Sequence, residues 1–322
     1  MKKILANDGI DKTGKELLEK AGFEVYTEKI PQEKLIDVIN EKEYAVLIVR
    51  SATQVRKDLI DACPVLKIIA RGGVGMDNID VEYAKQKGIT VINTPAASSH
   101  SVAELVFAHL FSLVRFLHSS NREMPINGNT AFNQLKKQYS AGKELKGKTL
   151  GIIGFGRIGQ EVAKMAIGLQ MNVITYDPYV SSAELEIELP PFNKKIAFNI
   201  KTDTFEHVLK NSDFITLHVP GGNIISKKEI NSMKDGVILI NAARGGVINE
   251  KDLLEALNSG KIAGAGLDVF ENEPNVNPEL LKHPKVSLTP HTGASTVEAQ
   301  ERIAIELAEK IIQAFSKLQI HS

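Results

Sequence analysis

Three residues whose side chains could carry out a dehydrogenation each follow a short apolar run. Arg244 follows VILIN among two alanines and two glycines, Glu273 lies in GLDVFENEP, and His291 lies in SLTPHTGAST. In open α/β sheets, residues beyond the carboxyl ends of the strands converge on one ligand edge. There a histidine can accept a hydroxyl proton, a carboxylate can orient the imidazole, and an arginine can bind a substrate carboxylate with two N–H groups. The alternative for Arg244 is an ordinary residue in a surface turn.

Among the eight histidines, only His218 competes with His291 for the role of proton acceptor. His218 ends another apolar run, directly before Val219 and Pro220. Taken alone, His291 could be a purely structural residue. Its place beside two other polar strand ends, those of Arg244 and Glu273, favours the chemical role.

A glycine pattern in TLGIIGFGRIG indicates a bound dinucleotide. Gly154, Gly156 and Gly159 form G-x-G-x-x-G between a predicted strand and a predicted helix, where a pyrophosphate meets the helix N-terminus. Asp177 ends the following strand, and a carboxylate there accepts hydrogen bonds from an adenosine ribose and repels a 2′-phosphate. We therefore expect NAD rather than NADP. The alternative is a doubly wound domain that binds no nucleotide.

The composition fits a soluble globular protein with a sizeable core. The 322 residues are 43% hydrophobic and 24% charged, with 39 basic and 39 acidic side chains, which gives no support for a nucleic-acid partner. The one cysteine, Cys63, excludes an intrachain disulfide and a cysteine-rich zinc site, and we expect no metal. No stretch approaches the ~20 apolar residues that span a membrane, and the N-terminal apolar run is too short for a signal peptide. We expect a cytoplasmic protein without a membrane partner.

Two series of alternating strands and helices must position these residues. The strands are predicted at Lys3–Ala6, Ala45–Val49, Leu66–Ala70 and Thr90–Ile92, then at Leu150–Gly154, Asn172–Asp177, Asp213–Val219, Val237–Asn241, Ala263–Asp268 and Val286–Thr289. We expect an α/β fold with two doubly wound parallel sheets, a Rossmann-type cofactor domain and a flavodoxin-like substrate domain. A final helix, VEAQERIAIELAEKIIQAF, could return to the first sheet. The substrate domain would then comprise residues 1–99 and 292–322, and the cofactor domain residues 100–291.

Two further segments stand apart from this alternation. A helix predicted over 101–118 is apolar nearly all round, and Ser101 with Glu104 suggests a capping box at its start. It is either buried inside its own domain or shared with a second subunit, and we favour the second interpretation. In residues 180–202, ELEIEL and KKIAFNI each alternate around PPFN, which predicts a hairpin.

Five stretches resemble signatures of the D-2-hydroxyacid dehydrogenase family, and within it of the phosphoglycerate dehydrogenases. They are RGGVGMDNIDVEYAKQKGITVINTP, GKTLGIIGFGRIGQEVA, LINAARGGVINEKDLLEAL, GLDVFENEP and PHTGASTVEAQ. The resemblance places the family's catalytic residues at Arg244, Glu273 and His291, and it implies a homodimer whose cofactor domains exchange the helix 101–118. The NAD contacts that it implies are Gly154, Gly156, Arg157, Ile158, Gly159, Asp177, Val219, Pro220, Ala242, Ala243, Asp268 and Ala294.

The resemblance also bears on the substrate. The positions that match the substrate contacts of the phosphoglycerate enzymes are Arg50, Ser51, Arg71, Gly72 and Gly73. It implies oxidation of 3-phospho-D-glycerate to 3-phosphohydroxypyruvate in serine biosynthesis, by a short form without the C-terminal regulatory domain. The alternatives are a glyoxylate or hydroxypyruvate reductase, another D-2-hydroxyacid dehydrogenase, and a non-enzymatic NAD-sensing protein of the same fold.

Overall fold

The computed structural model describes residues 2–320, and the chain divides into two compact units. The first unit comprises Met1–Ser99 and Ala294–Ser322, and the second comprises His100–Gly293. The last two residues of the predicted substrate domain, 321 and 322, lie outside the described residues. The first unit is therefore discontinuous in sequence.

The first unit contains a five-stranded parallel sheet. Its strands are β1 (Lys2–Ala6), β2 (Phe23–Tyr26), β3 (Tyr44–Val49), β4 (Ile68–Arg71) and β5 (Thr90–Asn93). They lie in the order β2-β1-β3-β4-β5, which confirms the flavodoxin-like prediction. The edge strand β2 was not predicted, because it has only four residues and follows directly on a glycine turn.

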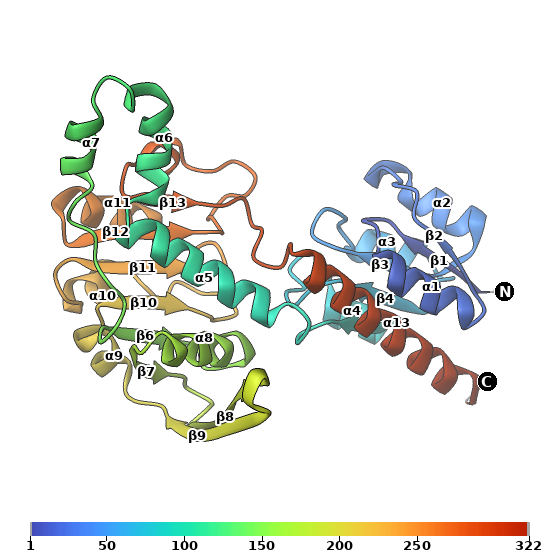
Figure 1. The fold of residues 1–322 in the computed structure, drawn as a ribbon. Helices are drawn as coiled ribbons and strands as arrows, with labels where there is room; N and C mark the ends of the chain where they lie inside the picture. The colour runs from blue at the N-terminus through green and yellow to red at the C-terminus, as the bar shows by residue number, and fades with distance from the viewer. Residues whose placement is uncertain (1, 321–322) are drawn as a thin grey trace. The chain divides into compact units, whose positions relative to one another are not determined.

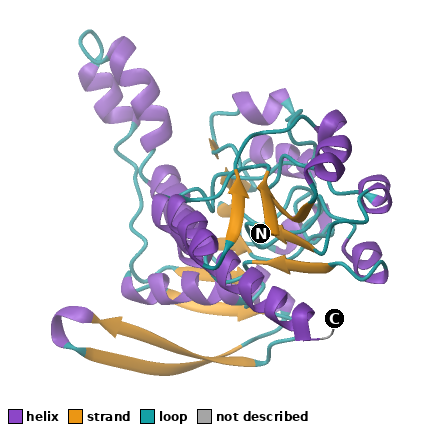
Figure 2. Ribbon diagram, turned by 90° about the vertical axis from the view of Figure 1, so that its right-hand side faces the viewer, coloured by secondary structure: helices purple, strands orange, loops and turns teal. Residues whose placement is uncertain are grey.

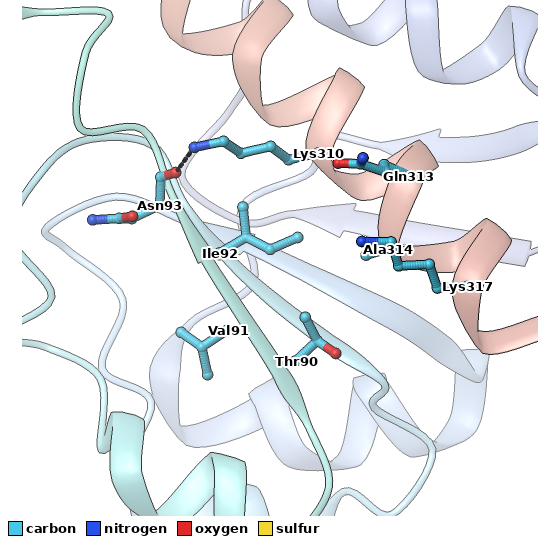
Figure 3. Close-up of a pocket in the computed structure, with 8 residues that line it drawn as sticks. All are labelled: Thr90, Val91, Ile92, Asn93, Lys310, Gln313, Ala314 and Lys317. Carbon is cyan, nitrogen blue, oxygen red and sulfur yellow. Dashed lines mark hydrogen bonds between the residues drawn. The ribbon is translucent and has the colours of Figure 1, made fainter.

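Helices cover both faces of this sheet (Figure 1). On one face lie α1 (Lys12–Lys20) and α13 (Val297–Ile320), and on the other lie η1 (Gln32–Lys34), α2 (Leu35–Lys42), α3 (Lys57–Ala62) and α4 (Val81–Gln86). The final helix thus returns to the first sheet as predicted. Figure 3 shows Lys310 of α13 reaching the edge strand β5, where its Nζ donates to the carbonyl of Asn93 at 2.8 Å.

The second unit contains a six-stranded parallel sheet in the order β13-β12-β11-β10-β6-β7. Its strands are β6 (Thr149–Ile153), β7 (Asn172–Tyr176), β10 (Phe214–Leu217), β11 (Val237–Asn241), β12 (Ile262–Leu267) and β13 (Val286–Leu288). One face is covered by α5 (Ser99–Val114) and α8 (Arg157–Gly168), and the other by α9 (Phe205–Asn211), α10 (Lys227–Ser232), α11 (Glu250–Ser259) and α12 (Pro278–Lys282). The winding reverses at β6, so the carboxyl ends of β6 and β10 flank the crevice where doubly wound sheets bind ligands.

The helix predicted over 101–118 has different bounds in the structure at both ends. It begins at Ser99 and stops at Val114, because Phe116 adopts a left-handed φ of 55° and turns the chain into α6 (Leu117–Asn127), which α7 (Phe132–Gln138) follows. The predicted capping box is also wrong, since Ser101 lies inside α5 and its hydroxyl donates to the carbonyl of Gly293. Among the described residues no single helix is long and apolar enough to span a membrane. The bent pair of α5 and α6 reaches that length and apolar composition only when the two helices are taken together.

The excursion at 180–202 is the hairpin that the alternation predicted. It consists of the antiparallel strands β8 (Ser182–Leu189) and β9 (Lys194–Lys201), joined by η2 (Pro190–Phe192). Leu185 and Phe198 pack into the core that α8 covers, whereas Phe192 of η2 is exposed. Figures 1 and 2 show the course of the hairpin. The hairpin lies near β7, the edge of the sheet remote from Arg244, Glu273 and His291.

Candidate active site

Arg244, Glu273 and His291 follow β11, β12 and β13, which are adjacent strands of one parallel sheet. Because parallel strands end at the same edge, the sheet brings the loops that carry these residues to one side of the unit. The glycine loop after β6 and Asp177 after β7 lie at that edge too. This arrangement is the one that the sequence predicts.

A hydrogen bond joins the two ionisable residues of this set. His291 Nδ1 lies 2.8 Å from Glu273 Oε2, and Glu273 Oε1 accepts from the backbone N–H of Phe270 at 2.9 Å. A carboxylate can only accept, so the shared proton sits on Nδ1 and leaves Nε2 with a lone pair. Both side chains are partly exposed, which gives a reactant access to them. The pair can therefore act as a proton acceptor that is oriented by a carboxylate.

Asp268 holds the segment that carries His291. Its side chain is buried, with Oδ1 accepting from the hydroxyl of Thr289 (2.6 Å) and the N–H of Thr292 (2.7 Å), and Oδ2 accepting from the N–H of Gly293 (2.9 Å). His291 itself has a φ of 55°, which is uncommon for a residue with a side chain and persists only where its surroundings fix it. Asp268, predicted only as an NAD contact, thus also positions the histidine loop.

The loop of Arg244 is packed against the loop of Glu273 at a glycine. A Cβ atom on Gly245 would lie 1.8 Å from the carbonyl oxygen of Phe270, so only glycine permits this approach. Asn241, at the end of β11, donates to the carbonyl of Arg244 at 2.9 Å and accepts from the N–H of Ala243 at 3.1 Å. Sequence reasoning missed this role of Asn241, although a polar residue that closes an apolar strand was a signal for it.

His218 is a poor alternative to His291. Its Nε2 lies 3.0 Å from the hydroxyl of Thr216, and burial lowers its pKa to about 3. The imidazole is therefore a weak proton acceptor at neutral pH. Its Nδ1 is buried without a hydrogen-bond partner among the described residues. His291 is therefore the better candidate for the proton acceptor.

The glycine loop fits a dinucleotide. Gly154 has a φ of 94°, and a Cβ atom there would lie 2.3 Å from the carbonyl oxygen of His218. A Cβ atom on Gly159 would lie 2.2 Å from the carbonyl of Gly154, whereas Gly156 has open space around it. Gly156 is the N-cap of α8 and brings no capping side chain, so the first N–H groups of the helix, at Arg157 and Ile158, are available for a pyrophosphate.

Asp177 links the glycine loop to the end of β7. Its Oδ2 accepts from the N–H of Phe155 at 2.7 Å, and its Oδ1 accepts from the N–H groups of Tyr179 and Val180 at 2.8 and 3.0 Å. A carboxylate has about four acceptor sites, so capacity remains for a ribose hydroxyl. Asp177 would hold the adenosine ribose while fixing the loop.

The other predicted NAD contacts fall into two groups. Val219, Pro220, Ala242 and Ala243 follow β10 and β11 at the same edge of the sheet. Ala294 instead belongs to the first unit, where its carbonyl accepts from the side chain of Gln300 at 2.7 Å. The structure thus gathers all of the predicted NAD contacts except Ala294 in the second unit.

The predicted substrate residues lie together in the first unit. Arg50 and Ser51 follow β3, and Arg71, Gly72 and Gly73 lie at the end of the adjacent strand β4. Arg50 and Gly72 line a cavity of about 260 Å³ at this edge. Among the described residues the Arg50 guanidinium has no hydrogen-bond or ion-pair partner, although its backbone N–H and carbonyl are both bonded. A half-buried guanidinium without a hydrogen-bond or ion-pair partner favours binding of an anionic ligand.

Comparisons with known proteins identify relatives of the whole chain. Residues 107–293 match the family model described as D-isomer specific 2-hydroxyacid dehydrogenase, NAD binding domain. A hydroxypyruvate reductase of Thermotoga maritima is 46% identical over 319 residues, 97% of each chain. A D-3-phosphoglycerate dehydrogenase of Bacillus subtilis is 40% identical across 100% of this chain, which spans 58% of that relative. The crystal structure of a glyoxylate reductase from Paecilomyes thermophila superposes with a TM-score of 0.81 at 30% identity, covering 98% of this chain and 96% of that one.

Proposed function

The chain belongs to the D-isomer specific 2-hydroxyacid dehydrogenase family, and we propose that it oxidises 3-phospho-D-glycerate to 3-phosphohydroxypyruvate. Its relatives are oxidoreductases, and residues 107–293 form an NAD-binding domain. The observation that carries the proposal is the 2.8 Å contact of His291 with Glu273, at strand ends next to that of Arg244. A place in serine biosynthesis is part of the same proposal.

The three residues have distinct roles in the proposed reaction. His291 Nε2 accepts the proton of the substrate's C2 hydroxyl, and Glu273 stabilises the imidazolium that forms. Arg244 binds the substrate carboxylate through two parallel N–H···O bonds, which fix the orientation of C2. When bound, NAD supplies the acceptor for the hydride that leaves C2.

The phosphate of the proposed substrate calls for a cation, and within residues 2–320 the Arg50 guanidinium has no hydrogen-bond or ion-pair partner. A second candidate function is the reduction of hydroxypyruvate, which lacks this phosphate. The hydroxypyruvate reductase of Thermotoga maritima favours it, because that relative is 46% identical over 97% of both chains.

A comparison of two oxo acids separates the candidates. We expect kcat/KM with NADH to be higher for 3-phosphohydroxypyruvate than for hydroxypyruvate, as measured by the loss of NADH absorbance. An equal or reversed ratio would replace the phosphoglycerate assignment with hydroxypyruvate reduction. No loss of NADH with any 2-oxo acid would indicate a non-enzymatic NAD-binding protein.

Asp177→Asn should weaken NADH binding and reduce discrimination against NADPH. The change removes the negative charge of the carboxylate, which would accept hydrogen bonds from the ribose diol and repel a 2′-phosphate. Bonds to charged groups contribute about 1.5–3 kcal/mol, so we expect the Kd of NADH to rise by roughly 10- to 100-fold. Titration of nicotinamide fluorescence with each cofactor gives both constants. An unchanged ratio of the two would rule out this role for Asp177.

We also propose a homodimer formed through α5, α6 and α7. Large apolar side chains are exposed on these helices at Phe111, Leu117, Met124, Ile126 and Phe132. Ile126, which is 77% exposed, would be covered by the partner. Ile126→Asp should therefore lower the mass measured by light scattering towards that of one chain, whereas Tyr179→Asp, at a 94% exposed site near the hairpin, should not. A monomeric unmodified chain would refute the proposal.

A further inference from the structure

The segment from Arg50 to Thr53 is held at both ends by buried polar side chains. The Asp8 carboxylate, of which 5% is exposed, accepts from the N–H of Arg50 at 2.7 Å and from the N–H and hydroxyl of Thr53 at 3.1 and 2.8 Å. Asn78 donates to the carbonyls of Arg50 and Thr53 at 2.7 and 2.6 Å. Every backbone polar group of the two terminal residues of this segment is therefore bonded to a side chain from elsewhere in the unit.

Asn7 and Lys29 complete the support of this segment. Asn7 donates to the hydroxyl of Thr53 at 2.9 Å, and Lys29 forms an ion pair with Asp8. Burial raises the pKa of Asp8, but the bonds from Lys29, Arg50 and Thr53 outweigh it and lower the pKa overall. Asp8 is thus an ionised acceptor at neutral pH, with a geometry fixed from three directions.

The middle of the segment is left open. Ser51 and Ala52 are exposed, and among the described residues their N–H groups donate to no backbone or side-chain acceptor. Arg50, the preceding residue, lines the cavity of about 260 Å³ that Asp8 also lines. A guanidinium, a hydroxyl and two N–H groups are the donors that an oxyanion such as phosphate takes.

We propose that Asp8 is a positioning residue that, with Asn78, presets the Arg50–Thr53 segment to bind the phosphate of the substrate. This inference rests on the proposed function, in which the substrate is phosphorylated. Asp8 does not touch the phosphate in this account. It acts through Arg50 and Ser51, because a cation and donors that are already in place lose less conformational freedom on binding.

The sign of the effect separates positioning from simple electrostatics. Removal of a negative charge close to an anion would by itself tighten anion binding. The Asp8 carboxylate binds four donors, two on each oxygen. The asparagine amide can keep the N–H groups of Arg50 and Thr53 on its oxygen only by turning its NH₂ group towards the Lys29 ammonium, which breaks the ion pair and holds the segment less firmly. We therefore expect the KM for 3-phosphohydroxypyruvate to rise by about 10- to 100-fold, the range for lost bonds to a charged group, and the KM for hydroxypyruvate to change much less.

A double-mutant cycle with Arg50→Met tests whether Asp8 acts through Arg50. The expected result is that Asp8→Asn adds little to the KM for 3-phosphohydroxypyruvate once Arg50 is replaced. Additive effects, or equal effects on both oxo acids, would overturn the inference. Asp61→Asn is the matched control: Asp61, on α3, pairs with Lys87 and accepts from the hydroxyl of Tyr83, and it is not among the residues that line the cavity, so the ratio of the two KM values should stay that of the unmodified chain.

Two further arms keep the test decisive. If Asp8→Asn does not fold, Asn78→Ser takes its place in the cycle, because Asn78 holds the two carbonyls. If the unmodified chain shows no preference for the phosphorylated acid, the proposed function fails, and inorganic phosphate as an inhibitor of hydroxypyruvate reduction then tests the inference alone. Weaker inhibition in Asp8→Asn would support positioning, and unchanged or stronger inhibition would refute it.

Discussion

His291→Gln should reduce turnover by roughly 10²–10⁴-fold, the contribution typical of a general base, and leave NADH binding close to normal. The glutamine amide matches the Nε2 edge of the imidazole in position, so an uncharged polar group stays where the substrate hydroxyl would bind. It has no nitrogen lone pair that can take up a proton, so the chemical step loses its acceptor. Steady-state rates with a 2-hydroxy acid and a fluorescence titration with NADH measure the two quantities separately.

The control for this variant is His207→Gln, the same substitution at a partly exposed histidine on α9. Its turnover should stay close to that of the unmodified chain. If His291→Gln keeps full turnover, the pair formed with Glu273 is not the proton acceptor, and His218→Gln becomes the next variant to measure.

Arg244→Lys should lower kcat/KM for every 2-hydroxy acid, whether or not it is phosphorylated. Lysine keeps the positive charge but replaces a planar fork of donors with a single ammonium, which cannot bind both carboxylate oxygens in parallel. Loss of one bond to a charged group costs about 1.5–3 kcal/mol, which corresponds to a decrease of roughly 10- to 100-fold.

Chemical rescue sharpens the second prediction. Arg244→Ala should be less active than Arg244→Lys, and added guanidinium should restore part of its activity, because the cavity left by the side chain admits the ion. Arg122→Lys, on α6, is the control and should leave kcat/KM unchanged. Normal kinetics in Arg244→Lys would refute carboxylate binding at this residue.

The sequence predicted the parts of the site that follow from strand ends. The apolar runs before Arg244, Glu273 and His291 became β11, β12 and β13, and their order in the sheet makes them neighbours. The glycine loop was predictable for the same reason, because each glycine meets a steric demand that the strand–loop–helix arrangement imposes. These predictions succeeded because strand periodicity and the ligand edge of parallel sheets are local or topological rules.

The supporting contacts could not be predicted, because they join residues that lie far apart in the chain. The carboxylate of Asp8 reaches the segment that begins at Arg50, and the amide of Asn78 reaches the same segment from the other side. The contact of Gly245 with Phe270 likewise depends on how two loops pack. The early end of α5 depends on a single left-handed residue, Phe116, which an apolar pattern does not reveal.

The most direct test of the central claim uses 3-phospho-D-glycerate deuterated at C2. The chain, supplied with this acid and NAD, should release 3-phosphohydroxypyruvate and reduced NAD that carries the deuterium at C4 of the nicotinamide, as measured by mass spectrometry. His291→Gln should slow both products together. Formation of the oxo acid without deuterium in the reduced cofactor, or the absence of both products, would contradict a hydride-transferring dehydrogenase built on Arg244, Glu273 and His291.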